Sequence, residues 1–207
     1  MKLYTAPRAP NPRRVAMFMA EKGIDMDLQL VDLGKGEHRS EAYLAVNPFG
    51  RLPALELDDG RILCETRAIC TYLEGLHPGP NLMGEGYEER AFIEMADRRV
   101  ELHLLAIAAN SIRHSHPGFA ALENPQFQDF GASQAGKFRD NALWLDGVLA
   151  GQPYVAGGRF TIADITAFCG MEFARGLMKF RPAEHGMAHL QAWRDRIAAR
   201  TSATAGT

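Results

Sequence analysis

A chain of 207 residues, 46% hydrophobic and 23% charged, is long enough to bury a core as one or two globular domains. The formal net charge of −2 gives no electrostatic basis for binding nucleic acid or an anionic membrane surface, and the apolar runs are far shorter than a bilayer span. The three cysteines lack Cys-x-x-C spacing, which argues against a disulfide framework or a structural zinc site. A strand signal begins directly after Met1 and leaves no room for a signal peptide, so we expect a cytoplasmic protein.

The first 76 residues carry signals in the order strand, helix, strand, short helix, two strands and helix. The predicted strands span residues 2–5, 27–33, 54–57 and 61–64, and the predicted helices span 12–22, 41–46 and 66–76. In the first helix, Asn11 suits the N-cap, Pro12 the first helical position and Gly23 the residue after the last turn. A right-handed βαβ crossover implies a parallel central pair, so this order predicts a thioredoxin-like α/β domain.

The stretch Asn47–Leu57 and its continuation to Ile69 organise this domain. Asp59-Gly60 predicts a type I′ turn between the last two strands. The resulting hairpin delivers Glu65 and Thr66 to the start of a helix, opposite the backbone at Leu52 and Pro53. A helix start offers unpaired N–H groups and a partial positive charge, which suit the carboxylate of a small ligand.

Beyond residue 77 the strand pattern stops. A Pro/Gly-rich linker is followed by helical patterns at 87–114 and 138–149, by a capping box at Thr161–Asp164, and by a last helix with Leu190, Trp193 and Ile197 on its apolar face. In the second of these patterns Leu143 and Trp144 are counted among the apolar positions. Residues 201–207 are expected to be a frayed tail.

The sequence Asn-Pro-Phe-Gly-Arg-Leu-Pro-Ala-Leu at 47–55, followed by the acidic-hydroxyl pair 65–66 and Ala-Ile, resembles the glutathione-binding domain of bacterial cytosolic glutathione transferases. Residues 152–164 resemble the loop and capped helix of that family's second domain. The resemblance implies a thioredoxin-like domain at 1–77, a linker at 78–86 and an all-helical domain at 87–207. It also implies glutathione as co-substrate without a metal, a small electrophilic or disulfide substrate, and a homodimer with no nucleic-acid or membrane partner.

The same resemblance implies roles for particular residues. Pro53 would be cis, the backbone of Leu52 would pair with the cysteinyl part of glutathione, and Glu65 with Thr66 would hold the γ-glutamyl end. His38 and Arg51 match positions that contact the glycyl carboxylate in some classes; the alternative for each is a solvated loop residue. His103 lies on the long helical pattern near where a second substrate would lie, although a lone histidine on a helix is more often an ordinary packed residue.

The loop after the first strand departs from the family pattern, because the usual catalytic Ser or Cys falls at Ala9 or Pro10. Its Pro-Asn pair also resembles the Nu class, where a Thr and an Asn face the sulfur and disulfide reduction is common. Asn11 matches that Asn and is the candidate catalytic residue, donating to the thiolate; the alternative is that Asn11 only caps the helix. Two functions therefore stay open: a transferase that activates the glutathione thiol, and a non-catalytic glutathione-binding or interaction protein of the same fold.

Overall fold

The computed structural model describes all 207 residues, and they form two compact units. The first unit contains residues 1–81 together with 201–207, and the second contains residues 82–200. The boundaries predicted above, 1–77, 78–86 and 87–207, are those of independently folding domains, and they stay a prediction.

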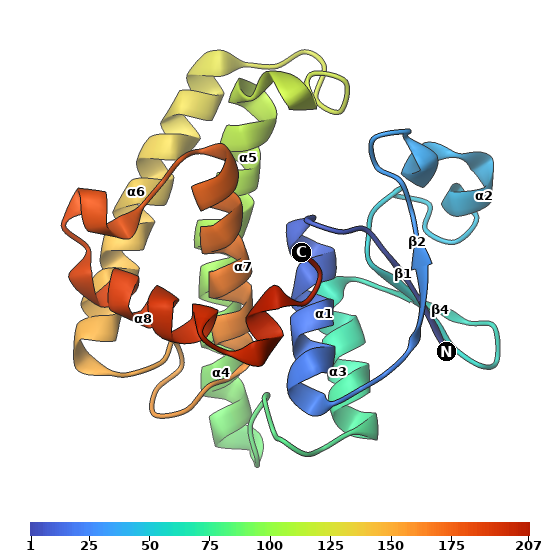
Figure 1. The fold of residues 1–207 in the computed structure, drawn as a ribbon, viewed down its shortest axis with the longest axis horizontal. Coiled ribbons are helices and arrows are strands. Elements are labelled where there is room, and N and C mark those ends of the chain that lie inside the picture. Colours follow the sequence, from blue (N-terminus) through green and yellow to red (C-terminus); the bar gives the residue numbers. More distant parts are fainter. The chain divides into compact units, whose positions relative to one another are not determined.

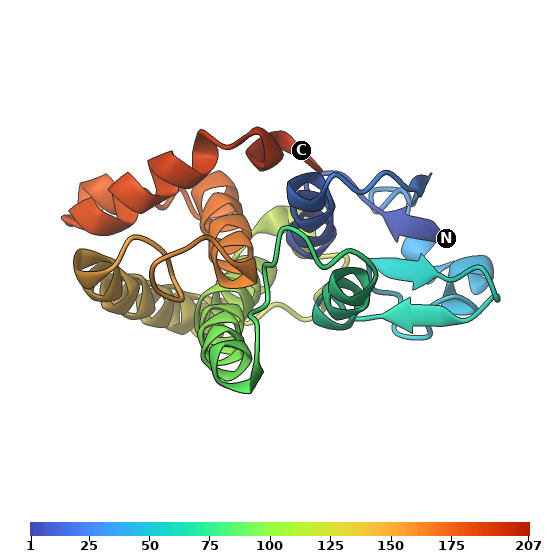
Figure 2. The ribbon, with the colours of Figure 1, turned by 90° about the horizontal axis from the view of Figure 1, so that it is seen from below.

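A four-stranded sheet with the strand order β2-β1-β3-β4 is the centre of the first unit. The elements are β1 (Lys2–Thr5), α1 (Pro10–Lys22), β2 (Asp27–Leu30), α2 (Glu41–Leu44), β3 (Ala54–Glu56), β4 (Ile62–Cys64) and α3 (Thr66–Leu76). β1 pairs with β2 in parallel and with β3 antiparallel, and β3 pairs with β4 antiparallel. Helices α1 and α3 cover one face of the sheet and α2 lies on the other side (Figures 1 and 2). The thioredoxin-like prediction is confirmed.

The core of this unit lies between the sheet and its two helices. Leu3, Leu55, Phe18, Ile69 and Leu73 are each at most 1% exposed. Such burial is worth about 1.5–3 kcal/mol for each side chain, which makes this layer the main source of stability for the unit.

A buried lysine connects the ends of the two helices. Lys22 Nζ, in the last turn of α1, forms an ion pair with Glu74 at 2.8 Å and donates to the carbonyl oxygens of His77 (2.6 Å) and Pro80 (2.7 Å). A buried charge is tolerated when it is paired and hydrogen-bonded, so this cation fixes the chain that leaves α3 against α1.

Two details of the predicted strands were wrong. The second strand ends at Leu30 rather than residue 33, and Leu28 and Leu30 are 54% and 61% exposed because β2 is an edge strand. The hairpin turn has three residues, 58–60, since Leu57 N–H donates to the Arg61 carbonyl and only Gly60 has a positive φ (83°). This is a type I turn closed by a left-handed glycine rather than the expected type I′ turn.

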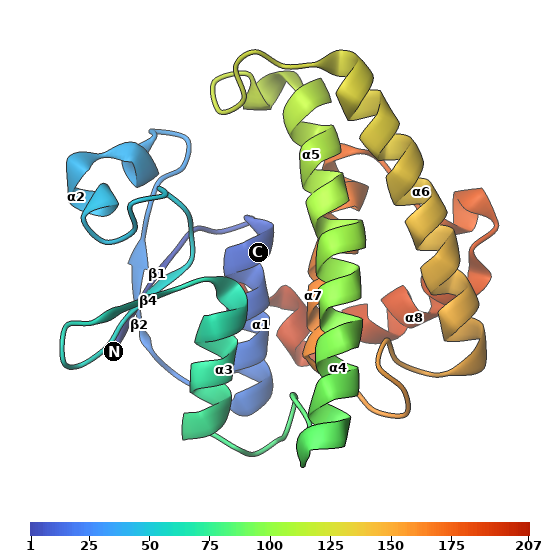
Figure 3. The ribbon, with the colours of Figure 1, turned by 180° about the vertical axis from the view of Figure 1, so that it is seen from behind.

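The second unit is all helical. It contains α4 (Tyr87–Val100), α5 (Ala106–Ser115), α6 (Gln128–Gly151), α7 (Ile162–Leu177) and α8 (Ala188–Ala198). The pattern predicted as one helix over 87–114 is α4 and α5 joined by a π-helical segment, Glu101–Leu105, and the two follow one another as one long rod (Figure 3). None of the helices combines the length and the apolar character that crossing a bilayer requires.

Predicted core positions in this unit had mixed outcomes. Leu190, Trp193 and Ile197 of α8 are fully buried, as expected. The pattern at 138–149 lies in the C-terminal half of the longer α6. The buried stripe there contains Phe138, Ala142 and Leu145, whereas Leu143 and Trp144 are exposed. An aromatic side chain at helical spacing does not by itself identify the buried face.

The capping box at the start of α7 is present as predicted. The Asp164 carboxylate accepts from the backbone N–H of Thr161 and Val155 and from Trp193 Nε1, each at 2.9 Å. Burial raises the pKa of Asp164 to about 6, and the surrounding donors oppose that rise. One buried carboxylate thus connects the cap of α7, the loop before it and α8.

The segment 201–207 is not a frayed tail. Thr201–Thr204 forms a 3₁₀ turn, in which Ser202 and Ala203 are buried, and the segment packs on α1 within the first unit. Small side chains allow this close packing, which a prediction from composition alone could not see.

Candidate functional site

The end of the sheet at which β1 and β4 finish and β3 begins, here called the sheet edge, brings together three separate chain segments. Tyr4 near the end of β1 pairs with Ala54 at the start of β3, and Ala54 pairs with Cys64 at the end of β4. The same register carried one residue further puts Pro53 opposite Glu65. Helices α1 and α3 both begin at this edge, because each follows one of these strand ends. The topology therefore places two helix N-termini beside the segment 51–53.

The segment before β3 presents free backbone groups. The Leu52–Pro53 peptide is cis, as the resemblance predicts. The Arg51 carbonyl is held by Tyr43 Oη at 2.7 Å and by Asn47 Nδ2 at 2.8 Å. No backbone hydrogen bond involves Leu52, so its N–H and C=O are available to pair with an extended ligand, as at the edge of a sheet.

The backbone of Glu65, the residue just before α3, is strained. Glu65 has φ 71° and ψ 121°, is exposed, and occupies the N-cap position without using its side chain as a cap. Such backbone geometry in a residue other than glycine costs about 1–3 kcal/mol and often marks a binding site. Thr66 follows as a buried first helical residue. Together they offer a carboxylate and helix N-terminal N–H groups at one place.

His38 lies next to the turn that leads to Arg51. A Cβ at Gly50, whose φ is 58°, would lie 2.8 Å from the His38 carbonyl oxygen, so this close approach requires glycine. His38 is 6% exposed, and its Nδ1 has no hydrogen-bond partner. Burial, and then the charges of Arg39 and Arg51, lower the pKa of His38, so the imidazole is neutral at pH 7. The exposed Arg51 then supplies the positive charge here.

The start of α1 differs from the sequence prediction. Ala9 is the N-cap, because Arg13 N–H donates to its carbonyl at 3.1 Å, and Asn11 is the second helical residue rather than the cap. Pro10 and Pro12 have no N–H, so Asn11 carries the one backbone donor among the first three helical residues. Pro10 suits the first helical position as well as Pro12 does, and this shifted the prediction by two residues.

The side chain of Asn11 is exposed and oriented by an arginine that sequence reasoning missed. Arg14 Nη1 donates to Asn11 Oδ1 at 3.1 Å, and Arg14 is itself almost fully buried. With its oxygen held in this way, the amide turns its NH₂ donor away from Arg14. The signal in the sequence was an Asn and an Arg three residues apart, which share one face of a helix.

His103 lies in the second unit, on the π-helical segment. Its side chain is exposed, and its backbone carbonyl accepts from Asn141 Nδ2 at 2.7 Å. π-Helical turns are often found at functional sites. The predicted role of His103 toward a second substrate stays a prediction.

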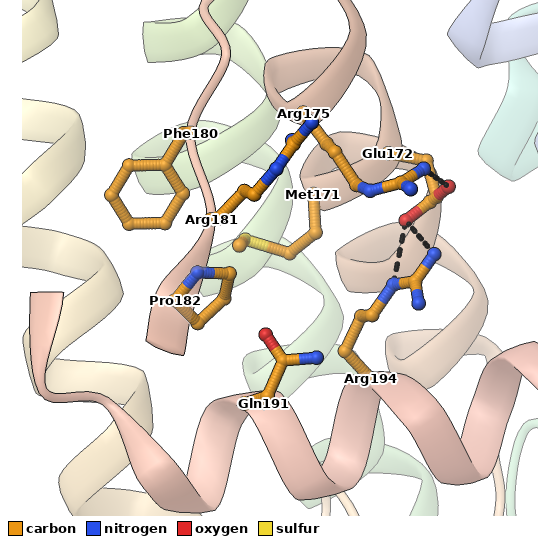
Figure 4. Close-up of a pocket in the computed structure, with 8 residues that line it drawn as sticks. All are labelled: Met171, Glu172, Arg175, Phe180, Arg181, Pro182, Gln191 and Arg194. Atoms are coloured by element: carbon orange, nitrogen blue, oxygen red, sulfur yellow. Dashed lines mark hydrogen bonds and ion pairs between the residues drawn. The ribbon is translucent and has the colours of Figure 1, made fainter. Parts of the chain in front are cut away.

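The second unit also contains a pocket of about 180 Å³ (Figure 4). Its lining consists of Met171, Glu172, Arg175, Phe180, Arg181, Pro182, Gln191 and Arg194. Glu172 accepts from both Nε and Nη2 of Arg194 at 2.8 Å, and every arginine of the pocket has a carboxylate within 4 Å. Glu172, Glu184 and Asp195 together balance the charges of the three arginines, and none of the predicted site residues lines the pocket.

Comparison with known proteins gives matches over most of the chain. The family model for the glutathione S-transferase N-terminal domain matches residues 3–81, and that for the C-terminal domain matches residues 134–201. Glutathione S-transferase 2 of Saccharomyces cerevisiae is 38% identical over 98% of this chain and 87% of its own length. Glutathione S-transferase 3 of Zea mays is 34% identical over 97% of this chain and 90% of its own. The crystal structure of a glutathione S-transferase domain-containing protein from Marinobacter aquaeolei has a TM-score of 0.93 at 40% identity, covering 99% of this chain and all of that one.

Proposed function

Since this chain belongs to the glutathione S-transferase family, we propose that it binds glutathione at the sheet edge of its first unit and activates the glutathione thiol for attack on an electrophile or a disulfide. In this proposal Leu52 pairs through its backbone with the cysteinyl part, and Glu65 with Thr66 binds the γ-glutamyl end. Neutral His38 and charged Arg51 bind the glycyl carboxylate.

Activation of the thiol is a matter of free energy. A free thiol has a pKa of about 8.5, and lowering it by about two corresponds to roughly 2.7 kcal/mol of stabilisation of the thiolate. A hydrogen bond to a charged group contributes about 1.5–3 kcal/mol, and a helix N-terminus about 0.3–1 kcal/mol. Two donors at the start of a helix are therefore sufficient.

The observation that carries the proposal is the geometry of Asn11. Its backbone N–H lies in the first turn of α1, between two prolines. Its amide NH₂ can donate to a ligand, because Arg14 binds the amide oxygen. Both donors lie at the helix start on the sheet edge that also holds Leu52 and Glu65. A Ser, Tyr or Cys is then not needed to stabilise a thiolate.

Replacing Asn11 by alanine is expected to raise the pKa of the bound glutathione thiol by about one and to slow turnover, while the affinity for glutathione changes less. The thiolate ultraviolet band of the complex, titrated against pH for both proteins, measures this. Asn110→Ala, also an asparagine on a helix but in the second unit, is the matched control. Superimposable curves for wild type and Asn11→Ala would assign activation to the backbone alone.

The reaction type is tested with a panel of a chloronitrobenzene, a hydroperoxide and a disulfide. Turnover of at least one of them is expected, because a stabilised thiolate attacks each of these classes. The alternative, a glutathione-binding protein without catalysis, is favoured by the absence of a Ser, Tyr or Cys from the loop 6–14. Bound glutathione with no turnover of any of the three would select it.

We further propose a homodimer in the cytoplasm. Exposed apolar side chains support the homodimer: Phe49 at the turn before Leu52 is 80% exposed, and Tyr87, Phe92 and Met95 are exposed along α4. Aromatic residues and methionine are enriched at protein–protein interfaces. Light scattering after gel filtration gives the oligomeric state.

A further inference from the structure

Three hydrogen bonds connect the segment 201–207 to α1 and to the loop before it. The Arg8 N–H donates to the Gly206 carbonyl at 2.9 Å, Arg13 Nη2 donates to the Ala203 carbonyl at 2.7 Å, and Ser202 Oγ donates to the Glu21 carboxylate. These contacts reach from the loop before the helix to its last turn, and all lie within the first unit. The segment is therefore hydrogen-bonded to α1 near both ends of the helix.

The bond to Arg8 falls on a strained residue. Arg8 has a φ of 63°, in the left-handed region that side-chain-bearing residues rarely adopt. Its side chain is exposed, so side-chain packing does not account for this conformation. Such geometry persists where surrounding structure imposes it, and here the Gly206 carbonyl holds the Arg8 N–H directly.

The segment 201–207 packs closely against α1, so a change in its position would also move the helix. Gly206 has a φ of 70°, and a Cβ added there would lie 3.1 Å from both Ala16 Cβ and Arg13 Cα. Ser202 and Ala203 are buried. A larger side chain at 206 would therefore push the segment away from α1, or push the first two turns of the helix.

The clamped residues flank the proposed thiol site. Arg8 precedes Asn11 by three residues, and Arg13 follows it by two, so the two bonds fix the chain on both sides of the thiolate donors. We propose that the segment 201–207 is a positioning element for thiol activation: it holds the loop 6–9 in the geometry that aims the donors of Asn11 at the sulfur. This inference rests on the proposed function.

The test compares two glycine substitutions in the full-length chain. Gly206→Val both strains the backbone and displaces the segment, whereas Gly186→Val imposes a similar strain, at φ 72°, where a Cβ would meet nothing. The readout is the thiolate ultraviolet band of the glutathione complex against pH. We expect Gly206→Val to reduce the thiolate fraction at neutral pH by about threefold to tenfold, and Gly186→Val to leave it unchanged.

A second variant covers the case in which Gly206→Val does not fold. Ser202→Ala removes the bond to Glu21, at the far end of α1 from the site, and is expected to give a smaller change in the same direction. Faster hydrogen exchange of the Arg8 amide should accompany either change. A wild-type thiol pKa equal to that of free glutathione would contradict the proposed function itself. A lowered wild-type pKa that neither variant raises would overturn this inference alone.

Discussion

Replacing Asp164 by alanine is expected to lower the free energy of unfolding by about 3–5 kcal/mol. Its fully buried carboxylate is the acceptor for two backbone N–H groups and for the indole of Trp193. Alanine leaves these three buried donors without an acceptor, at about 1–3 kcal/mol for each. Burial raises the pKa of Asp164 to about 6, and alanine recovers this cost of burying the charge, which keeps the expected loss below the sum.

Chemical denaturation at constant pH measures this effect, with two related variants beside it. Thr161→Ala removes the other side chain of the same capping box and should lower the free energy of unfolding by about 0.5–2 kcal/mol. Asp164→Asn keeps one acceptor oxygen and should fall between the two. Equal midpoints for Asp164→Ala and Thr161→Ala would show that Asp164 is only part of the cap.

The same carboxylate predicts a pH dependence. Its folded-state pKa of about 6 lies above the value of 3.8 for an unperturbed aspartate, so the folded protein binds more protons than the unfolded chain between these values. The contribution of Asp164 to stability is therefore fully present below about pH 4 and is lost as the pH rises through about 6. Asp164→Asn should lack this decline.

Replacing Glu65 by alanine is expected to weaken glutathione binding by more than tenfold. In the proposed complex its exposed carboxylate binds the ligand's ammonium group, and a hydrogen bond between charged groups contributes about 1.5–3 kcal/mol. The strained backbone of Glu65 already points to a role beyond folding. Calorimetric titration with glutathione measures the affinity.

Two controls separate recognition from structure. Glu65→Gln keeps a hydrogen-bond acceptor but removes the charge, so it should lose less affinity than alanine does. Glu88→Ala removes an exposed glutamate from the first turn of another helix, α4, and should bind glutathione like the wild type. Unchanged affinity in Glu65→Ala would show that the γ-glutamyl end binds elsewhere.

Local chemistry in the sequence predicted the parts of the fold that depend on it. The Thr161–Asp164 cap and Gly23 after α1 are determined by neighbouring residues, and the structure has both. The start of α1 was misplaced because Pro10 and Pro12 both satisfy the rule for the first helical turn. The exposed side of α6 was misread because burial there depends on which helices pack against it, a long-range property.

The candidate site likewise combines features that neighbouring residues determine with contacts between distant parts of the chain. The segments Leu52–Pro53 and Glu65–Thr66 were found from the stretch 47–69, whose residues are close together in the sequence. Arg14 as the partner of Asn11, and the contact of Gly206 with Arg8, were not found, because they depend on side-chain orientation and on two residues 198 positions apart in the chain. Turn and strand signals carry no information on either.

The pKa of the thiol in the wild-type glutathione complex shows whether this protein activates glutathione. Titration of the thiolate ultraviolet band, with glutathione at saturating concentration, gives this value without any substitution in the protein. If the start of α1 and Asn11 stabilise the thiolate, the pKa lies about one to two below the free-thiol value of about 8.5. A bound thiol that titrates at the same pH as free glutathione would contradict the account and leave a protein that binds glutathione without activating it.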